Sequence, residues 1–153
     1  MNKHNCVKIL VADDAAIVRE GLVAILDTIP GIQSISQTGN VGETVAAIQR
    51  DKPDLMILDY CMPDGTALDV LKAVRKYRPT PTTIVFTGYD DAVIRARCIM
   101  AGAHFFFVKG GELSSLIDTL REIIRGLNDG MTLAGSALWT IHRGIVTNKL
   151  ENP

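Results

Sequence analysis

Short apolar segments alternate along the chain with longer segments whose apolar residues recur at helical spacing. Four of the short segments, at residues 7–12, 55–58, 83–86 and 104–108, are rich in aliphatic, β-branched and aromatic residues, as buried strands are. Residues 32–38 alternate apolar and polar, which also predicts a strand. An amphipathic segment follows each one, at residues 17–26, 41–50, 67–77, 90–101 and 112–127. Pro30-Gly31 and Gly102 stand where helices are expected to stop.

Five strands that alternate with five helices predict the α/β class, as a doubly wound (βα)5 fold with a parallel sheet and helices on both faces. Right-handed crossovers leave few strand orders, and the flavodoxin-like order 2-1-3-4-5 is a common one. We expect a single domain at residues 7–127. Residues 128–153 are expected to form a tail or linker that could include a short helix, because Asn128-Asp129-Gly130 ends the last amphipathic segment.

Polar side chains stand just past four of the predicted strands. Asp13 and Asp14 follow the first strand, Asp59 the third, Thr87 the fourth and Lys109 the fifth. In this fold the carboxyl ends of the strands meet at the edge where ligands bind. At such short separations three carboxylates repel one another, and a hard divalent cation such as Mg²⁺ would relieve the repulsion. The pattern therefore predicts a Mg²⁺ site.

A carboxylate beside Mg²⁺ can also act as a nucleophile. Phosphoryl transfer to Asp59 would need charge cancellation on the transferred group, which Lys109 and the Thr87 hydroxyl could supply. The backbone carbonyl of Cys61 could complete the metal shell. Taken alone, Asp14 reads as a helix N-cap, Lys109 as a solvated side chain and Thr87 as a turn residue. Their joint placement favours the functional interpretation.

These motifs resemble those of response-regulator receiver (CheY-like) domains over residues 8–125. The matching segments are Val11-Ala12-Asp13-Asp14, Leu58-Asp59-Tyr60-Cys61-Met62-Pro63-Asp64-Gly65, Val85-Phe86-Thr87-Gly88, Gly102-Ala103 and Val108-Lys109. The resemblance implies that Asp59 is the phosphoacceptor, that Thr87 is the switch hydroxyl and that Lys109 contacts the phosphate. It implies phosphohistidine donors, on a sensor histidine kinase or a histidine phosphotransfer protein. Phosphorylation would repack the face of the fourth helix, fifth strand and fifth helix, through which a homodimer could form.

The sequence departs from the commonest family pattern at several positions. Phe106 stands where the switch aromatic is often Tyr, and an ordinary core aromatic is the alternative interpretation. Gly110 stands where the family often has Pro. The turn at Lys109-Gly110 and the glycines after the last helix resemble those of receivers joined to a LuxR/NarL-type helix-turn-helix domain. We expect either a stand-alone receiver or a receiver fragment of such a DNA-binding regulator. Cys61 and Tyr89 flank the phosphosite and offer no carboxylate or amide to orient water, so slow self-dephosphorylation is expected.

Composition narrows the remaining choices. A net charge of −1 argues against direct nucleic-acid binding by this chain. Cys6, Cys61 and Cys98 are odd in number and widely spaced, which favours reduced thiols in a cytoplasmic protein over disulfides or zinc. No apolar stretch reaches membrane-spanning length, and the first residues lack the pattern of a signal peptide. Trp139 is expected to anchor the tail.

Two rival hypotheses remain. A hydrolase or phosphatase with an Asp nucleophile usually carries a second Asp two residues later, where Cys61 stands here. A degenerate receiver that works without metal or phosphate would lack at least one key residue, and all five are present. We therefore expect a signalling switch that catalyses its own phosphorylation and slow dephosphorylation but is not a classical enzyme.

Overall fold

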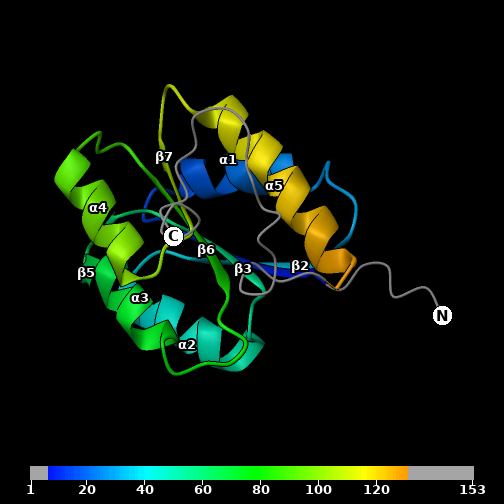
Figure 1. The fold of residues 1–153 in the computed structure, drawn as a ribbon, viewed down its shortest axis with the longest axis horizontal. Helices are drawn as coiled ribbons and strands as arrows, with labels where there is room; N and C mark the ends of the chain where they lie inside the picture. Colours follow the sequence, from blue (N-terminus) through cyan, green and yellow to red (C-terminus); the bar gives the residue numbers. More distant parts are fainter. Residues whose placement is uncertain (1–6, 131–153) are drawn as a thin grey trace, which may run out of the picture.

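The computed structural model describes residues 7–130. Its main sheet has five strands, all parallel, in the order β2-β1-β3-β6-β7 (Figure 1). The strands are β1 (Val7–Ala12), β2 (Ile32–Thr38), β3 (Leu55–Leu58), β6 (Thr82–Thr87) and β7 (Phe105–Val108). The expected order 2-1-3-4-5 is confirmed, since β6 and β7 are the fourth and fifth strands of this sheet. The expected tail helix and Trp139 lie outside the described residues.

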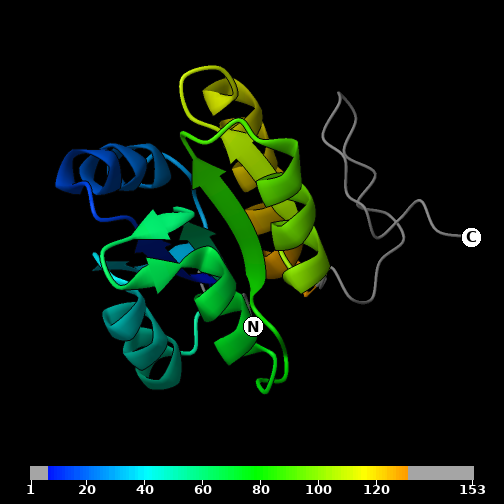
Figure 2. The ribbon, with the colours of Figure 1, turned by 90° about the vertical axis from the view of Figure 1, so that its left-hand side faces the viewer.

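Five helices cover the two faces of the sheet. They are α1 (Ala16–Leu26), α2 (Val41–Asp51), α3 (Ala67–Val74), α4 (Ala92–Ala101) and α5 (Leu113–Asn128). Helices α1 and α5 lie on one face and α2, α3 and α4 on the other (Figures 1 and 2). Among the described residues, no helix is long and apolar enough to cross a membrane.

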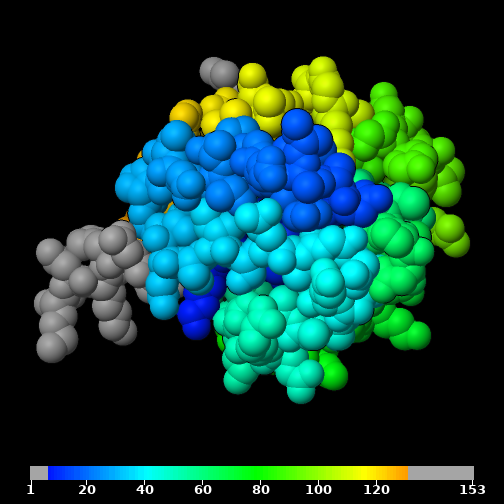
Figure 3. All heavy atoms as spheres, turned by 180° about the vertical axis from the view of Figure 1, so that it is seen from behind, coloured from blue at the N-terminus to red at the C-terminus, as the bar shows by residue number. Residues whose placement is uncertain are grey.

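Strand side chains form a core on each side of the sheet because neighbouring residues of a strand point to opposite faces. Ile9 and Val11 pack toward α1 and α5, whereas Leu10 and Ala12 pack toward α2 and α3. From behind, the segments of α1, β2 and α2 form the surface that meets the viewer (Figure 3). Both faces are thus covered, which is why the central strands read as almost continuous apolar runs.

Side chains at the helix starts fix where α2, α3 and α4 begin. Asn40 accepts a hydrogen bond from the backbone N–H of Glu43, and Asp91 accepts from two amides of the first turn of α4. Thr66 and Asp69 form a capping box at α3. Gly102 ends α4 with a φ of 117°, a conformation that favours glycine.

Some expectations need correction. A two-stranded antiparallel hairpin, β4 (Cys61–Met62) and β5 (Gly65–Thr66), follows Asp59 and was not predicted. Helix α4 begins at Ala92 rather than at residue 90, because Asp91 is its cap, and α3 ends at Val74 rather than at residue 77. Ile17 is 79% exposed although the pattern counted it as apolar and helical. The side chain of Ile17 therefore lies on the solvent-facing side of α1.

Candidate functional site

Three carboxylates meet at the carboxyl ends of β1 and β3. One oxygen from each of Asp13, Asp14 and Asp59 lies within 4.8 Å of the others. Asp13 is 2% exposed and Asp59 is 9% exposed, whereas Asp14 is open to solvent. Asp14 does not cap α1, since Ala15 holds the N-cap position without a side-chain bond. All donor atoms of this cluster are carboxylate oxygens, which fits a hard divalent cation.

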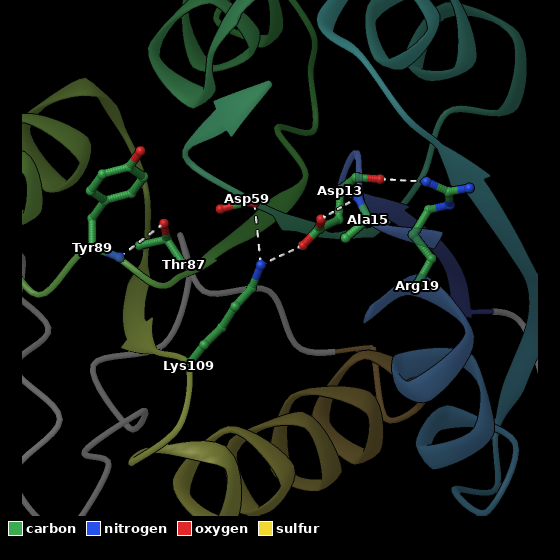
Figure 4. Close-up of polar contacts among 7 residues, drawn as sticks. All are labelled: Asp13, Ala15, Arg19, Asp59, Thr87, Tyr89 and Lys109. Atoms are coloured by element: carbon green, nitrogen blue, oxygen red, sulfur yellow. Dashed lines mark hydrogen bonds and ion pairs between the residues drawn. The ribbon is translucent and has the colours of Figure 1, made fainter. Parts of the chain in front are cut away.

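Asp13 is held on every side by hydrogen bonds (Figure 4). Its Oδ1 accepts from the backbone N–H of Ala15 at 2.9 Å, and its Oδ2 accepts from Lys109 Nζ at 2.6 Å. Its carbonyl oxygen accepts from Arg19 Nη1 at 2.6 Å, and its own N–H donates to the Thr38 carbonyl at 3.1 Å. The side chain of this residue is therefore fixed before any ligand binds.

Lys109 joins the ends of three strands. From the end of β7 its ammonium reaches Asp59 Oδ2 at 3.2 Å as well as Asp13. Burial raises the pKa of Asp59, and the charge of Asp13 raises it further, against the opposing effect of Lys109. Burial alone would lower the pKa of Lys109, but its bonds and charges with the two carboxylates outweigh this and raise it. When all are ionised, three carboxylates and one ammonium leave two negative charges (3 − 1), which a divalent cation would balance.

Thr87 and Tyr89 come from the end of β6 and the segment that follows it. Thr87 is fully buried, and the interaction of its side chain with the Asp59 carboxyl helps to oppose the rise of the Asp59 pKa. Its Oγ1 also accepts from the Tyr89 N–H at 3.4 Å. Tyr89 is 50% exposed and makes an edge contact with Tyr60, the ring centroids being 6.1 Å apart. Interactions with Cys61 raise the pKa of the Tyr89 hydroxyl, so this ring bridges two loops beside Asp59.

Phe106 lies inside β7 and is 3% exposed. The guanidinium of Arg95, from α4, lies 4.9 Å from the centroid of its ring. Arg95 Nη2 is also 4.0 Å from Glu112 Oε1.

The segment from Val108 to Glu112, which carries Lys109, is closed by two hydrogen bonds between its first and last residues. The Val108 N–H donates to Glu112 Oε2 at 2.6 Å, and the Glu112 N–H donates to the Val108 carbonyl at 3.1 Å.

Every side chain expected at the carboxyl edge of the sheet is found there. Cys61 begins the β4–β5 hairpin two residues after Asp59, and it is exposed. Cys98 is fully buried in α4, and the ring of His104 accepts at Nδ1 from the Thr83 N–H. The roles given to these residues remain predictions. Sequence reasoning overlooked two further groups at this end of the molecule.

The overlooked groups are Arg19 and Asp64. Arg19 lies on α1, where a cation normally reads as a solvated side chain. Asp64 accepts from the backbone N–H groups of Val41 and Gly42 at 2.6 and 2.9 Å, and these bonds hold its pKa below the ordinary value. It thereby joins the hairpin after Asp59 to the start of α2. Only the Asp64-Gly65 turn signal marks it in the sequence.

The sequence model of one protein family, the response regulator receiver domain, matches residues 9–121 of this chain. The chain belongs to this family. As a receiver domain of two-component response regulators, it resembles the DNA-binding transcriptional activator DevR/DosR of Mycobacterium tuberculosis, with 29% identity over 90% of this chain and 64% of that protein. The response regulator GacA of Pseudomonas aeruginosa is 29% identical over 78% of this chain and 56% of its own length.

Solved structures agree with this fold. The signal receiver domain of the putative response regulator NarL from M. tuberculosis has a TM-score of 0.71 at 24% identity, over 80% of this chain and 98% of that one. The response regulator domain of Thermotoga maritima CheB has a TM-score of 0.70 at 25% identity, over 82% and 98%. The matched region spans 64% of the length of DevR/DosR and 56% of the length of GacA. The activities of these two relatives are therefore those of proteins longer than the region they share with this chain.

Proposed function

We propose that Asp59 accepts a phosphoryl group from a phosphohistidine and that Asp13 and Asp14, with Asp59 and the Cys61 carbonyl, hold Mg²⁺ during the transfer. The observation that carries this proposal is the meeting of three carboxylates, within 4.8 Å, at the strand ends. The donor is a sensor histidine kinase or a histidine phosphotransfer protein. Bound Mg²⁺ would supply positive charge beside the transferred phosphoryl oxygens.

The residues divide the chemistry between them. A carboxylate oxygen of Asp59 forms a bond to phosphorus as the bond between phosphorus and the donor imidazole nitrogen breaks, and the imidazole leaves with that electron pair. Lys109 and Thr87 already contact the Asp59 carboxylate. They are therefore close enough to interact with the negative charge on the oxygens of the newly attached phosphoryl group. The chain acts as a switch that modifies itself, rather than as an enzyme that turns over a separate substrate.

The phosphorylated state is proposed to act through Thr87 and Phe106 on the face formed by α4, β7 and α5. That face could dock a partner or a second copy of the chain. We place the receiver at residues 7–127 of a cytoplasmic regulator, with residues 128–153 as a tail or linker. Its similarity to DevR/DosR and GacA supports the alternative that it is the receiver part of a DNA-binding regulator of the LuxR/NarL type. DNA contact would then belong to another domain.

Acetyl phosphate tests the phosphoacceptor. Incubation with Mg²⁺ should add one phosphoryl group to the wild-type mass, and chelation of Mg²⁺ should prevent it. Asp59→Asn should abolish the addition, whereas Asp64→Asn, which removes a carboxylate outside the cluster, should retain it. Equal labelling of Asp59→Asn and wild type would refute the assignment.

The lifetime of the phosphorylated state is a separate proposal. Tyr89 and Cys61 flank Asp59 without offering a group that orients water, and the Tyr89 ring could shield the phosphoryl group. We expect slow loss of phosphate in purified protein and faster loss in Tyr89→Ala. A half-life of seconds that is the same in both proteins would contradict this.

A further inference from the structure

Arg19 contacts the backbone of the acidic cluster rather than its carboxylates. It is the fourth residue of α1, and its Nη1 donates to the Asp13 carbonyl at 2.6 Å (Figure 4). The same nitrogen lies 3.5 Å from where a Cβ on Gly39 would stand. The guanidinium therefore fills the space between the end of β1 and the loop after β2.

The fold gives no simple reason for an arginine at this point. The Nε of Arg19 is buried and has no hydrogen-bond partner among residues 7–130. A buried donor without a partner costs free energy. Arg19 thus makes a short bond to one carbonyl at the metal end of the sheet while another of its donors stays unsatisfied. The function of Arg19 is therefore expected to depend on its hydrogen bond to the Asp13 carbonyl.

That contact acts on Asp14 through the peptide bond. The Asp13 carbonyl belongs to the planar unit that links Asp13 to Asp14, so a donor fixed on this oxygen sets the plane from which Asp14 departs. The side chain of Asp13 has two anchors of its own, Ala15 and Lys109. Asp14 is exposed, and its direction depends on the backbone that carries it.

We propose that Arg19 is a positioning residue, which holds the Asp13–Asp14 peptide so that the Asp14 carboxylate faces Asp13 and Asp59 ready for a divalent cation. This inference rests on the Mg²⁺ site of the proposed function. It follows the general behaviour of metal sites, in which groups behind the ligands orient them and strongly affect affinity.

Charge and positioning predict opposite signs for the loss of Arg19. If Arg19 acted only through its charge, removing a cation beside three carboxylates would make Mg²⁺ bind more tightly. If it positions Asp14, its removal makes Mg²⁺ bind more weakly. The direction of the change in affinity therefore separates the two roles without reference to phosphorylation.

The experiment is calorimetric titration of Mg²⁺ into wild type, Arg19→Met, Arg19→Lys and the control Arg50→Met, with thermal melts in the absence of divalent ions to establish folding. Arg50 is an exposed arginine that pairs with its neighbour Asp51, and its replacement removes the same charge. We expect about tenfold weaker binding in Arg19→Met. Arg19→Lys should fall between it and wild type, because lysine keeps the charge but not the reach and planar fork of arginine. Arg50→Met should bind like wild type.

The outcomes are distinct. Wild-type protein that fails to bind Mg²⁺ removes the proposed metal site and this inference with it. If wild type binds and any folded Arg19 variant binds as tightly or more tightly, the positioning role alone is overturned. Should Arg19→Met not fold, Arg19→Lys decides by the same criterion.

Discussion

Lys109 offers the sharpest test of the electrostatics of this site, through the variant Lys109→Met. The substitution keeps the aliphatic length of the side chain and removes the ammonium that lies 2.6 Å from Asp13 and 3.2 Å from Asp59. The two carboxylates, whose side chains are 3% and 11% exposed, are then left facing each other. We expect the variant to be less stable than wild type at neutral pH in the absence of divalent ions.

The size of the loss follows from these distances. At an effective dielectric constant of about 20, the two attractions are worth about 6 and 5 kcal/mol, and two carboxylate oxygens at the 4.8 Å upper limit of their separation repel by about 3.5 kcal/mol. Attraction therefore wins, although desolvation cancels much of it. Removing one partner of a buried pair costs about 3–5 kcal/mol. Because 24% of the Lys109 side chain is exposed, we expect a loss of about 1–3 kcal/mol.

Urea denaturation across a range of pH measures this loss. The pKa of Lys109 is raised above its ordinary value of 10.5, so its contribution is present below that value and is lost as the pH rises through the folded value. The pKa of Asp59 is also raised, so the cost of its charge disappears as the pH falls through its folded value. The difference between variant and wild type should therefore be largest between these limits and shrink on both sides.

Lys72→Met, at an exposed position of α3, is the matched control and should change little. Addition of Mg²⁺ should stabilise Lys109→Met more than wild type, because the cation then replaces the missing charge. Equal stability of Lys109→Met and wild type at neutral pH would refute the reasoning. So would a loss that stays constant from acid to alkaline pH.

Three further predictions concern the groups around the site. Asp91→Ala removes the cap that accepts from two amides of α4 and should lower the free energy of unfolding by about 1 kcal/mol in urea titration, where an unchanged midpoint would speak against the cap. The pKa of Asp64 is lowered by the amides it accepts from, so its contribution is present above its ordinary pKa and is lost as the pH falls through the folded value. Asp64→Asn should therefore flatten the acid side of a plot of Tm against pH, and an identical acid side would exclude this. Burial raises the pKa of Cys98 to about 11, so a thiol reagent at about pH 8 should label Cys61 and spare Cys98 in folded protein, as peptide mass mapping can check; labelling of both would contradict the burial.

Four of the five strands of the main sheet were predictable because they are buried and appear as short apolar runs, each ending where the polar site begins. The edge strand β2 is only partly buried, and it was predictable from its alternation of apolar and polar residues. The β4–β5 hairpin escaped prediction because strands of two residues, such as Cys61–Met62, are too short to show a period. Ile17 misled for a related reason, since an apolar residue near the start of a helix can satisfy the helical pattern and still face solvent.

The site was predictable as far as strand ends define it. Asp13, Asp59 and Lys109 converge because parallel strands carry them to one edge. That Lys109 would bridge both carboxylates was not evident, because reach and rotamer depend on packing. Arg19 left no signal, since its bond is to a backbone carbonyl and any residue could supply that acceptor.

The closed segment between Val108 and Glu112 has a mechanical consequence. Its two ends are joined by reciprocal hydrogen bonds, and Glu112 is also the N-cap residue of α5. Lys109 thus lies in a short segment whose two ends are hydrogen-bonded to each other. If a phosphoryl group on Asp59 attracts the Lys109 ammonium, as proposed, the resulting displacement would be transmitted to the first turn of the sixteen-residue helix α5.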